Sequence, residues 1–171
     1  MSHFFQHLGQ PEYVHTLINP IPIYGLAIGI IALIAGLFLR TRAAVLPGLI
    51  AIFLSAVSVW PVFEYGEKSY DQVYSMENIE GQAWLNTHMH RAEKAVYLFY
   101  GLAAIALLAI LFPIKWRAAT LPLAVVTCVV ALAALAAGGW VAYAGGKIRH
   151  HEFRRADEPP PQGSEREEHS D

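Results

Sequence analysis

Charged side chains are absent from four long stretches of this 171-residue chain. The stretches are residues 13–39, 43–63, 95–114 and 118–146, and only 15% of all residues are charged, against about 25% in an ordinary soluble domain. An uncharged apolar run of about 18 residues or more is typical of a helix that spans a membrane. This distribution largely excludes a soluble globular protein, and it leaves no segment that could form a large catalytic domain with its own core.

Several other features are scarce. The single cysteine, Cys128, cannot form an intrachain disulfide, and we interpret it as a packing residue. No basic stretch exists outside short interhelical loops, which argues against nucleic-acid binding. The N-terminus lacks the basic region and the cleavage site of a signal peptide, so we expect the first apolar stretch to be a retained helix. All four stretches lack the intramembrane charges of a pump or proton channel.

The sequence therefore predicts an all-α fold, an integral membrane four-helix bundle with both termini on the same, outer side. The predicted spans are residues 20–39, 44–62, 93–111 and 121–146, and the third helix can extend back toward Trp84. They belong to a transmembrane domain of residues 16–153, which follows an N-terminal segment of residues 1–15. Residues 154–171 form a proline-rich acidic tail, for which we expect disorder.

Basic residues in the short loops give the expected orientation. Loops 1–2 and 3–4 contain Arg40, Arg42, Lys115 and Arg117 and no acid, whereas the segment 64–94 has six acids and three bases. The positive-inside rule places the two short loops in the cytoplasm. Both termini then face outward, to the periplasm if this is the inner membrane of a Gram-negative bacterium. A basic cluster at Lys147, Arg149, Arg154 and Arg155 argues in the opposite direction.

The same topology gathers ligand-type side chains at the outer end of the bundle. His15 precedes the first helix, Glu64 follows the second, His88 and His90 precede the third, and His150 and His151 follow the fourth. Neutral imidazole is the commonest metal ligand, and two histidines also suit a b-type haem. Histidines at a membrane interface are also common without any metal, so ordinary interfacial residues are the competing interpretation.

A shared site would use one histidine from each neighbouring pair, because residues one or two apart on a helix point to different faces. We favour His90, since Glu93 and Lys94 lie one turn further, and His150, which lies on an extension of the last helix beyond Tyr143. The choices between His88 and His90, and between His150 and His151, stay open. A metal site would consist of His15, Glu64, His90 and His150, and its carboxylate would favour Zn, Fe or Mn over haem alone. The aromatic residues Trp60, Tyr97, Trp140 and Tyr143 are predicted to line a cofactor pocket.

Three parts of the chain resemble a family of small four-helix bacterial membrane proteins known only as a domain of unknown function. The resemblance covers residues 13–153: the opening His15-Thr16-Leu17-Ile18-Asn19-Pro20, the acidic stretch Glu64-Tyr65-Gly66-Glu67 with His90 and Glu93, and the ending Gly145-Gly146-Lys147-Ile148-Arg149-His150. It implies histidines in one outer layer and an association with redox chemistry. Asn19 stands where the family often has histidine, which argues against a version with two cofactors.

Two functions fit these features. The first is a protein of the bacterial inner membrane that binds haem b or a transition-metal ion and passes electrons from membrane quinol to a periplasmic carrier. The alternative is a non-catalytic, accessory subunit of a larger membrane complex. A transporter is less consistent with the sequence, because the spans have no polar midplane. The sequence does not decide whether the protein is an enzyme.

Overall fold

The computed structural model describes residues 7–154, so the predicted acidic tail lies outside the described residues except for Arg154. The described chain is all-α. Its helices are α2 (Pro11–Ile18), α3 (Pro20–Leu39), α4 (Arg42–Met76), α5 (Ile79–Leu111) and α6 (Thr120–Arg149). Three short 3₁₀ helices accompany them: η1 (Phe112–Ile114), η2 (Arg117–Ala119) and η3 (His151–Phe153).

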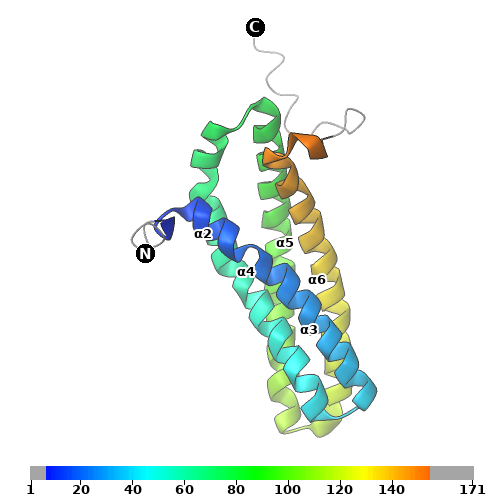
Figure 1. Cartoon of the computed structure of the whole chain (residues 1–171). Coiled ribbons are helices and arrows are strands. Elements are labelled where there is room, and N and C mark those ends of the chain that lie inside the picture. The colour runs from blue at the N-terminus through cyan, green and yellow to red at the C-terminus, as the bar shows by residue number, and fades with distance from the viewer. Residues whose placement is uncertain (1–6, 155–171) are drawn as a thin grey trace.

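Four helical segments are long and apolar enough to cross a membrane, namely Pro11–Leu39, Arg42–Met76, Ile79–Ile114 and Arg117–Arg149. They run side by side as an elongated bundle (Figure 1). One end holds α2, the α4–α5 turn and η3, and we call it the hairpin end. The other end holds the α3–α4 turn and the η1–η2 connection, and we call it the basic end. The predicted all-α fold is therefore confirmed over the described residues, with four helices long and apolar enough to span a membrane.

The second and third helices are longer than the sequence predicted. The polar segment 63–91 is helical almost throughout, because α4 continues to Met76 and α5 begins at Ile79 rather than near residue 93. The Asn78 side chain caps α5 by accepting a hydrogen bond of 2.8 Å from the Gly81 N–H. At 35 residues, α4 is about 50 Å long, more than the roughly 30 Å of a bilayer core. The two helices can therefore project from the membrane as a hairpin.

A break between α2 and α3 separates the N-terminal turns from the first full span. Pro20 has no N–H to donate, so the hydrogen-bond ladder is interrupted at Asn19, although the Asn19 backbone stays helical, at φ −52° and ψ −34°. The helix already begins at Pro11, inside the predicted N-terminal segment 1–15. As a result, His15 lies on a helix that packs against α4 rather than in a free terminus.

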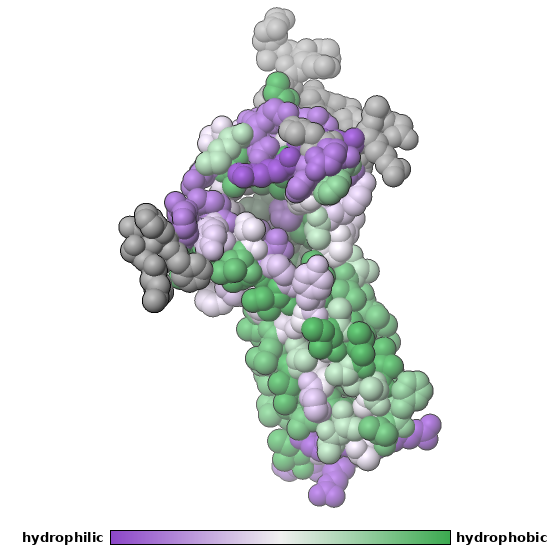
Figure 2. Space-filling view, viewed as in Figure 1, coloured by the Kyte–Doolittle hydropathy of each residue, from purple (hydrophilic) through white to green (hydrophobic). Residues whose placement is uncertain are grey.

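Apolar side chains form both the core and the outer surface along most of the bundle. Leu26, Leu33, Ile52 and Leu102 are completely buried, whereas Phe38 is 81% exposed. On the face in view, Figure 2 shows mostly apolar residues over the lower part of the molecule, with polar residues concentrated at the two ends. An apolar exterior over an apolar core is the arrangement expected where lipid replaces water as the solvent.

Ion pairs and hydrogen bonds connect the hairpin to α6 and α2. Arg149 contacts Glu77 at 3.1 Å, and Arg154 contacts Glu80 at 3.2 Å. The Gln72 side chain donates a hydrogen bond of 3.1 Å to Glu12. These contacts join segments distant in sequence and hold the hairpin end as one folded unit.

Candidate functional site

His15 of α2 and His88 of α5 face each other at the hairpin end of the bundle. Their ring centres are 6.4 Å apart, and the ring planes are nearly perpendicular, at 86°. Both side chains are partly buried. The structure thus brings together two imidazoles from helices that are far apart in the sequence.

A backbone carbonyl fixes the orientation of each ring. The Nδ1–H of His15 donates to the Val62 carbonyl at 2.9 Å, and the Nδ1–H of His88 donates to the Val141 carbonyl at 3.0 Å. A carbonyl oxygen only accepts, so Nδ1 carries the proton in each neutral ring. The lone pair of a neutral ring is then on Nε2, the atom available to a metal. A metal-binding histidine typically has this kind of support from its second nitrogen.

A glycine lies beside each ring, one helical turn after the valine whose carbonyl accepts the hydrogen bond from that ring. Gly66 and Gly145 each follow the accepting valine by four residues, which is one helical turn. A Cβ placed at Gly66 would lie 3.1 Å from His15 Cε1, and one placed at Gly145 would lie 3.0 Å from His88 Nδ1. Any side chain at either position would crowd the imidazole. Helices α4 and α6 therefore provide matching surfaces for the two rings.

The four predicted metal ligands are not brought together. His90 is exposed and lies 3.8 Å from Glu93, and His150 is exposed, with a contact of 2.8 Å to Glu152. Glu64 contacts Lys68 at 2.9 Å. Over residues 7–154, no group of three or more His, Cys, Asp or Glu side chains is arranged to hold a metal ion. Of the predicted ligands, only His15 belongs to the histidine pair, and its partner is His88 rather than His90.

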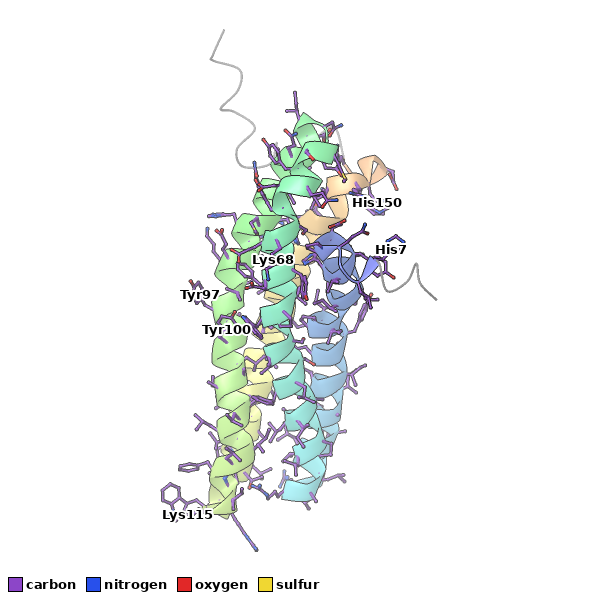
Figure 3. All side chains as sticks on the ribbon, turned by 90° about the vertical axis from the view of Figure 1, so that its left-hand side faces the viewer. His7, Lys68, Tyr97, Tyr100, Lys115 and His150 are labelled. Atoms are coloured by element: carbon purple, nitrogen blue, oxygen red, sulfur yellow. The ribbon has the colours of Figure 1, made fainter. Side chains whose placement is uncertain are left out.

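The predicted pocket aromatics divide into two groups. Trp60 and Tyr97 are 61% and 75% exposed, and Figure 3 places Tyr97 on the outer side of α5. These two residues have the exposure expected of lipid-facing side chains rather than of a pocket lining. Trp140 and Tyr143 are about half exposed and contact cations instead: the Arg91 guanidinium lies 4.6 Å from the Trp140 ring centre.

A buried lysine near this end was not anticipated from the sequence. Lys147 is only 4% exposed, and its Nζ donates a hydrogen bond of 2.7 Å to the Tyr143 hydroxyl. The same Nζ lies 4.7 Å from the centre of the Trp84 ring and 4.2 Å from that of Tyr143. Contact with two aromatic faces is favourable for an ammonium group that has lost water. The sequence signal was the spacing of four between Tyr143 and Lys147 on a helix.

Comparisons with known proteins identify no relative: no family model, curated protein or solved structure matches this chain. The resemblance to the four-helix family consequently stays a prediction, and the functional argument depends on the site alone.

Proposed function

We propose that this protein binds one b-type haem between His15 and His88 and transfers electrons at the surface of the bacterial inner membrane. The observation that carries the proposal is the facing pair of imidazoles, each held through Nδ1 by a backbone carbonyl. This pairing revises the predicted choice of His90 and His150, while the type of chemistry stays the same.

The donor set favours haem over a bare metal ion. A protein that binds a structural or catalytic zinc ion supplies three or four ligands, and a haem iron already has four from its porphyrin. The described residues offer two imidazoles and no third ligand in a group. The two imidazoles are the residues that would hold such a haem.

The separation of the rings is consistent with this assignment. An imidazole nitrogen bonds a metal at about 2 Å, and the ring centre lies roughly 1 Å further, so two imidazoles on opposite sides of one metal have centres about 6 Å apart. The His15 and His88 ring centres are 6.4 Å apart. The spacing is compatible with a shared ligand, and it also lies within the range of about 4.5–7 Å for two rings in direct edge contact, so the haem spectrum and not the distance decides.

A haem held by two histidines would supply a one-electron carrier. The residues of this chain would fix both imidazoles through the Val62 and Val141 carbonyls, and the lack of a side chain at Gly66 and Gly145 would leave room for the rings themselves. Membrane quinol is the proposed electron donor and a periplasmic carrier the proposed acceptor, since the pair lies between the apolar spans and the projecting hairpin.

The absorption spectrum of the purified protein tests this function. We expect a Soret band and, after dithionite, the sharp visible bands of a reduced b-type haem, with iron near one atom per chain by elemental analysis. Absence of both the Soret band and stoichiometric iron would contradict the proposal. That result would favour the alternative, an accessory subunit of a larger membrane complex. Co-purification of the protein with the other subunits of that complex would test this alternative.

The proposal also places the hairpin end and both termini on the periplasmic side, as the basic loops predict. In a Cys128→Ala background, Ser75→Cys at the hairpin should react with a membrane-impermeant maleimide in intact spheroplasts. Lys115→Cys, at the basic end, should react only after the membrane is opened. Both Ser75 and Lys115 are exposed in the structure, so the comparison reports sidedness rather than burial. If Lys115→Cys alone were labelled in intact spheroplasts, the basic end would face the periplasm and the proposed orientation would be wrong.

A further inference from the structure

A second polar site lies at the basic end of the bundle, away from the histidine pair. A pocket of about 550 Å³ opens there between the α3–α4 turn and the η1–η2 connection. Three arginines contribute to its lining, together with apolar residues from the start of α6 and from η1. Its lining includes Arg40, Arg42, Arg117, Pro113, Ile114 and Leu121.

The charge of this pocket is not balanced by nearby acids. None of the lining residues is Asp or Glu. The sequence has no acid from residue 13 to 63 or from 94 to 151, so α3, the first half of α4 and all of α6 contribute none. The carboxylates that pair with cations over residues 7–154 are at the hairpin end instead. Three arginines therefore line the pocket, with no carboxylate among the described residues that line it, so an anionic ligand would meet no repulsion there.

The backbone positions two of these arginines. Arg42 Nη2 donates a hydrogen bond of 2.9 Å to the Ile110 carbonyl near the end of α5, which holds this guanidinium across the gap between α4 and α5. Its remaining N–H groups can donate to another acceptor, because a guanidinium carries five donors. Arg40 caps α3 with a left-handed backbone, at φ 55°, and turns the chain toward the pocket.

The rim of the pocket is apolar. Ile114 lines the pocket and is 69% exposed, and Trp116, on the same connection but outside the lining, is 57% exposed. Figure 2 shows polar residues at this tip directly below the apolar surface. This is the level of the lipid headgroups for a bundle that spans a bilayer, where tryptophan is also enriched. A ligand that fits must combine an anionic group with an apolar part.

We propose that this pocket binds the phosphate of an anionic phospholipid, with the acyl chains lying against the apolar surface next to it. Arginine recognises phosphate through paired N–H donors, and basic pockets between membrane helices suit anionic headgroups. Inorganic phosphate shares the headgroup chemistry but has no apolar part to use the rim. The proposal is independent of haem binding, because it depends on residues at the other end of the molecule.

Native mass spectrometry of the full chain in mild detergent tests the proposal, with phosphatidylglycerol as the probe and phosphatidylcholine as the neutral comparison. Arg117→Gln removes one charge. Arg40→Asn removes another with a residue that tolerates the left-handed cap. Each change should weaken phosphatidylglycerol binding at least about tenfold, because hydrogen bonds to charged groups contribute about 1.5–3 kcal/mol. Binding of phosphatidylcholine should be weak and unchanged.

Lys115→Gln is the matched control, because Lys115 is exposed on the same connection but does not line the pocket. It should change binding by less than about twofold, because it removes an exposed charge without removing a hydrogen-bond donor from the pocket lining. An equal loss in Lys115→Gln would overturn the proposal in favour of general surface charge. Displacement of the lipid by millimolar inorganic phosphate would show a phosphate site instead. A normal elution profile and thermal transition for each variant exclude misfolding as the cause of a loss.

Discussion

Replacing His88 with alanine should remove the haem spectrum of the purified protein. The His88→Ala and His15→Ala proteins each lose one of the two proposed axial ligands, and we expect the amount of bound haem to fall at least about tenfold. Even the loss of a group that only orients a metal ligand typically weakens metal binding by 10–100-fold, so the loss of a ligand should cost at least as much. The Soret absorbance, normalised to protein concentration, measures the effect.

His90→Ala and His150→Ala are matched controls for this experiment. Both residues are histidines at the hairpin end, and both are more than half exposed. Neither should change the Soret absorbance by more than the error of the measurement. If His90→Ala and His150→Ala abolish the spectrum while His88→Ala retains it, the pairing read from the structure is wrong and the original choice from the sequence is right.

Substitution of Gly48 should produce the largest loss of stability. Helices α3 and α4 approach so closely that a Cβ at Gly48 would overlap the backbone of Leu33, and one at Gly36 would overlap the backbone carbonyl of Ala44. Small residues allow this approach in membrane bundles. Gly48→Ala should lower the free energy of unfolding by about 3 kcal/mol, at the upper end of the range for overpacked cores, because backbone rather than a flexible side chain must move.

Gly101→Ala provides the comparison on a neighbouring helix, since a Cβ at Gly101 meets no atom within 4 Å. Alanine is the better helix former, so this change should leave stability equal or raise it by less than about 1 kcal/mol. Thermal unfolding in detergent, followed by circular dichroism, measures both variants. Equal stability of Gly48→Ala and the original protein would mean that α3 and α4 do not pack as described.

The spans were predictable because the absence of charge is a direct consequence of a membrane environment. All four uncharged stretches became helices that are long enough to cross a bilayer. The ends of α4 and α5 were not predictable in the same way. Outside the bilayer a helix tolerates charge, so the acids and bases between Glu64 and Lys94 gave no indication that the helices continue.

The inward position of His88 was nevertheless indicated by the spacing of α5. Buried residues recur on α5 at intervals of three and four, and the same register includes residue 88: Gly81, Leu85, Ala95, Phe99, Leu102 and Ala106. His88 therefore belongs to the inward stripe, whereas His90 lies off it and is exposed. The proposed pairing follows this register of α5, whereas the predicted choice of His90 followed its neighbour Glu93.

His15 also follows the spacing of the buried residues in its own helical segment. It lies seven residues before Pro22, and Pro22, Gly29 and Gly36 follow at intervals of seven on the buried face of α3. Its contact with His88 was not predictable, because that contact depends on α2 packing against α4 and on α5 beginning at Ile79. Both features are set by packing between segments that are distant in the sequence.

The spin state of the iron tests the central claim most directly. Electron paramagnetic resonance of the oxidised protein should show low-spin iron with six ligands, because two imidazoles complete the coordination that the porphyrin begins. Any haem that remains in the His88→Ala protein should be high-spin, with one axial position vacated. High-spin iron in the original protein, or low-spin iron that persists in a His15→Ala/His88→Ala double variant, would contradict the assignment of this pair.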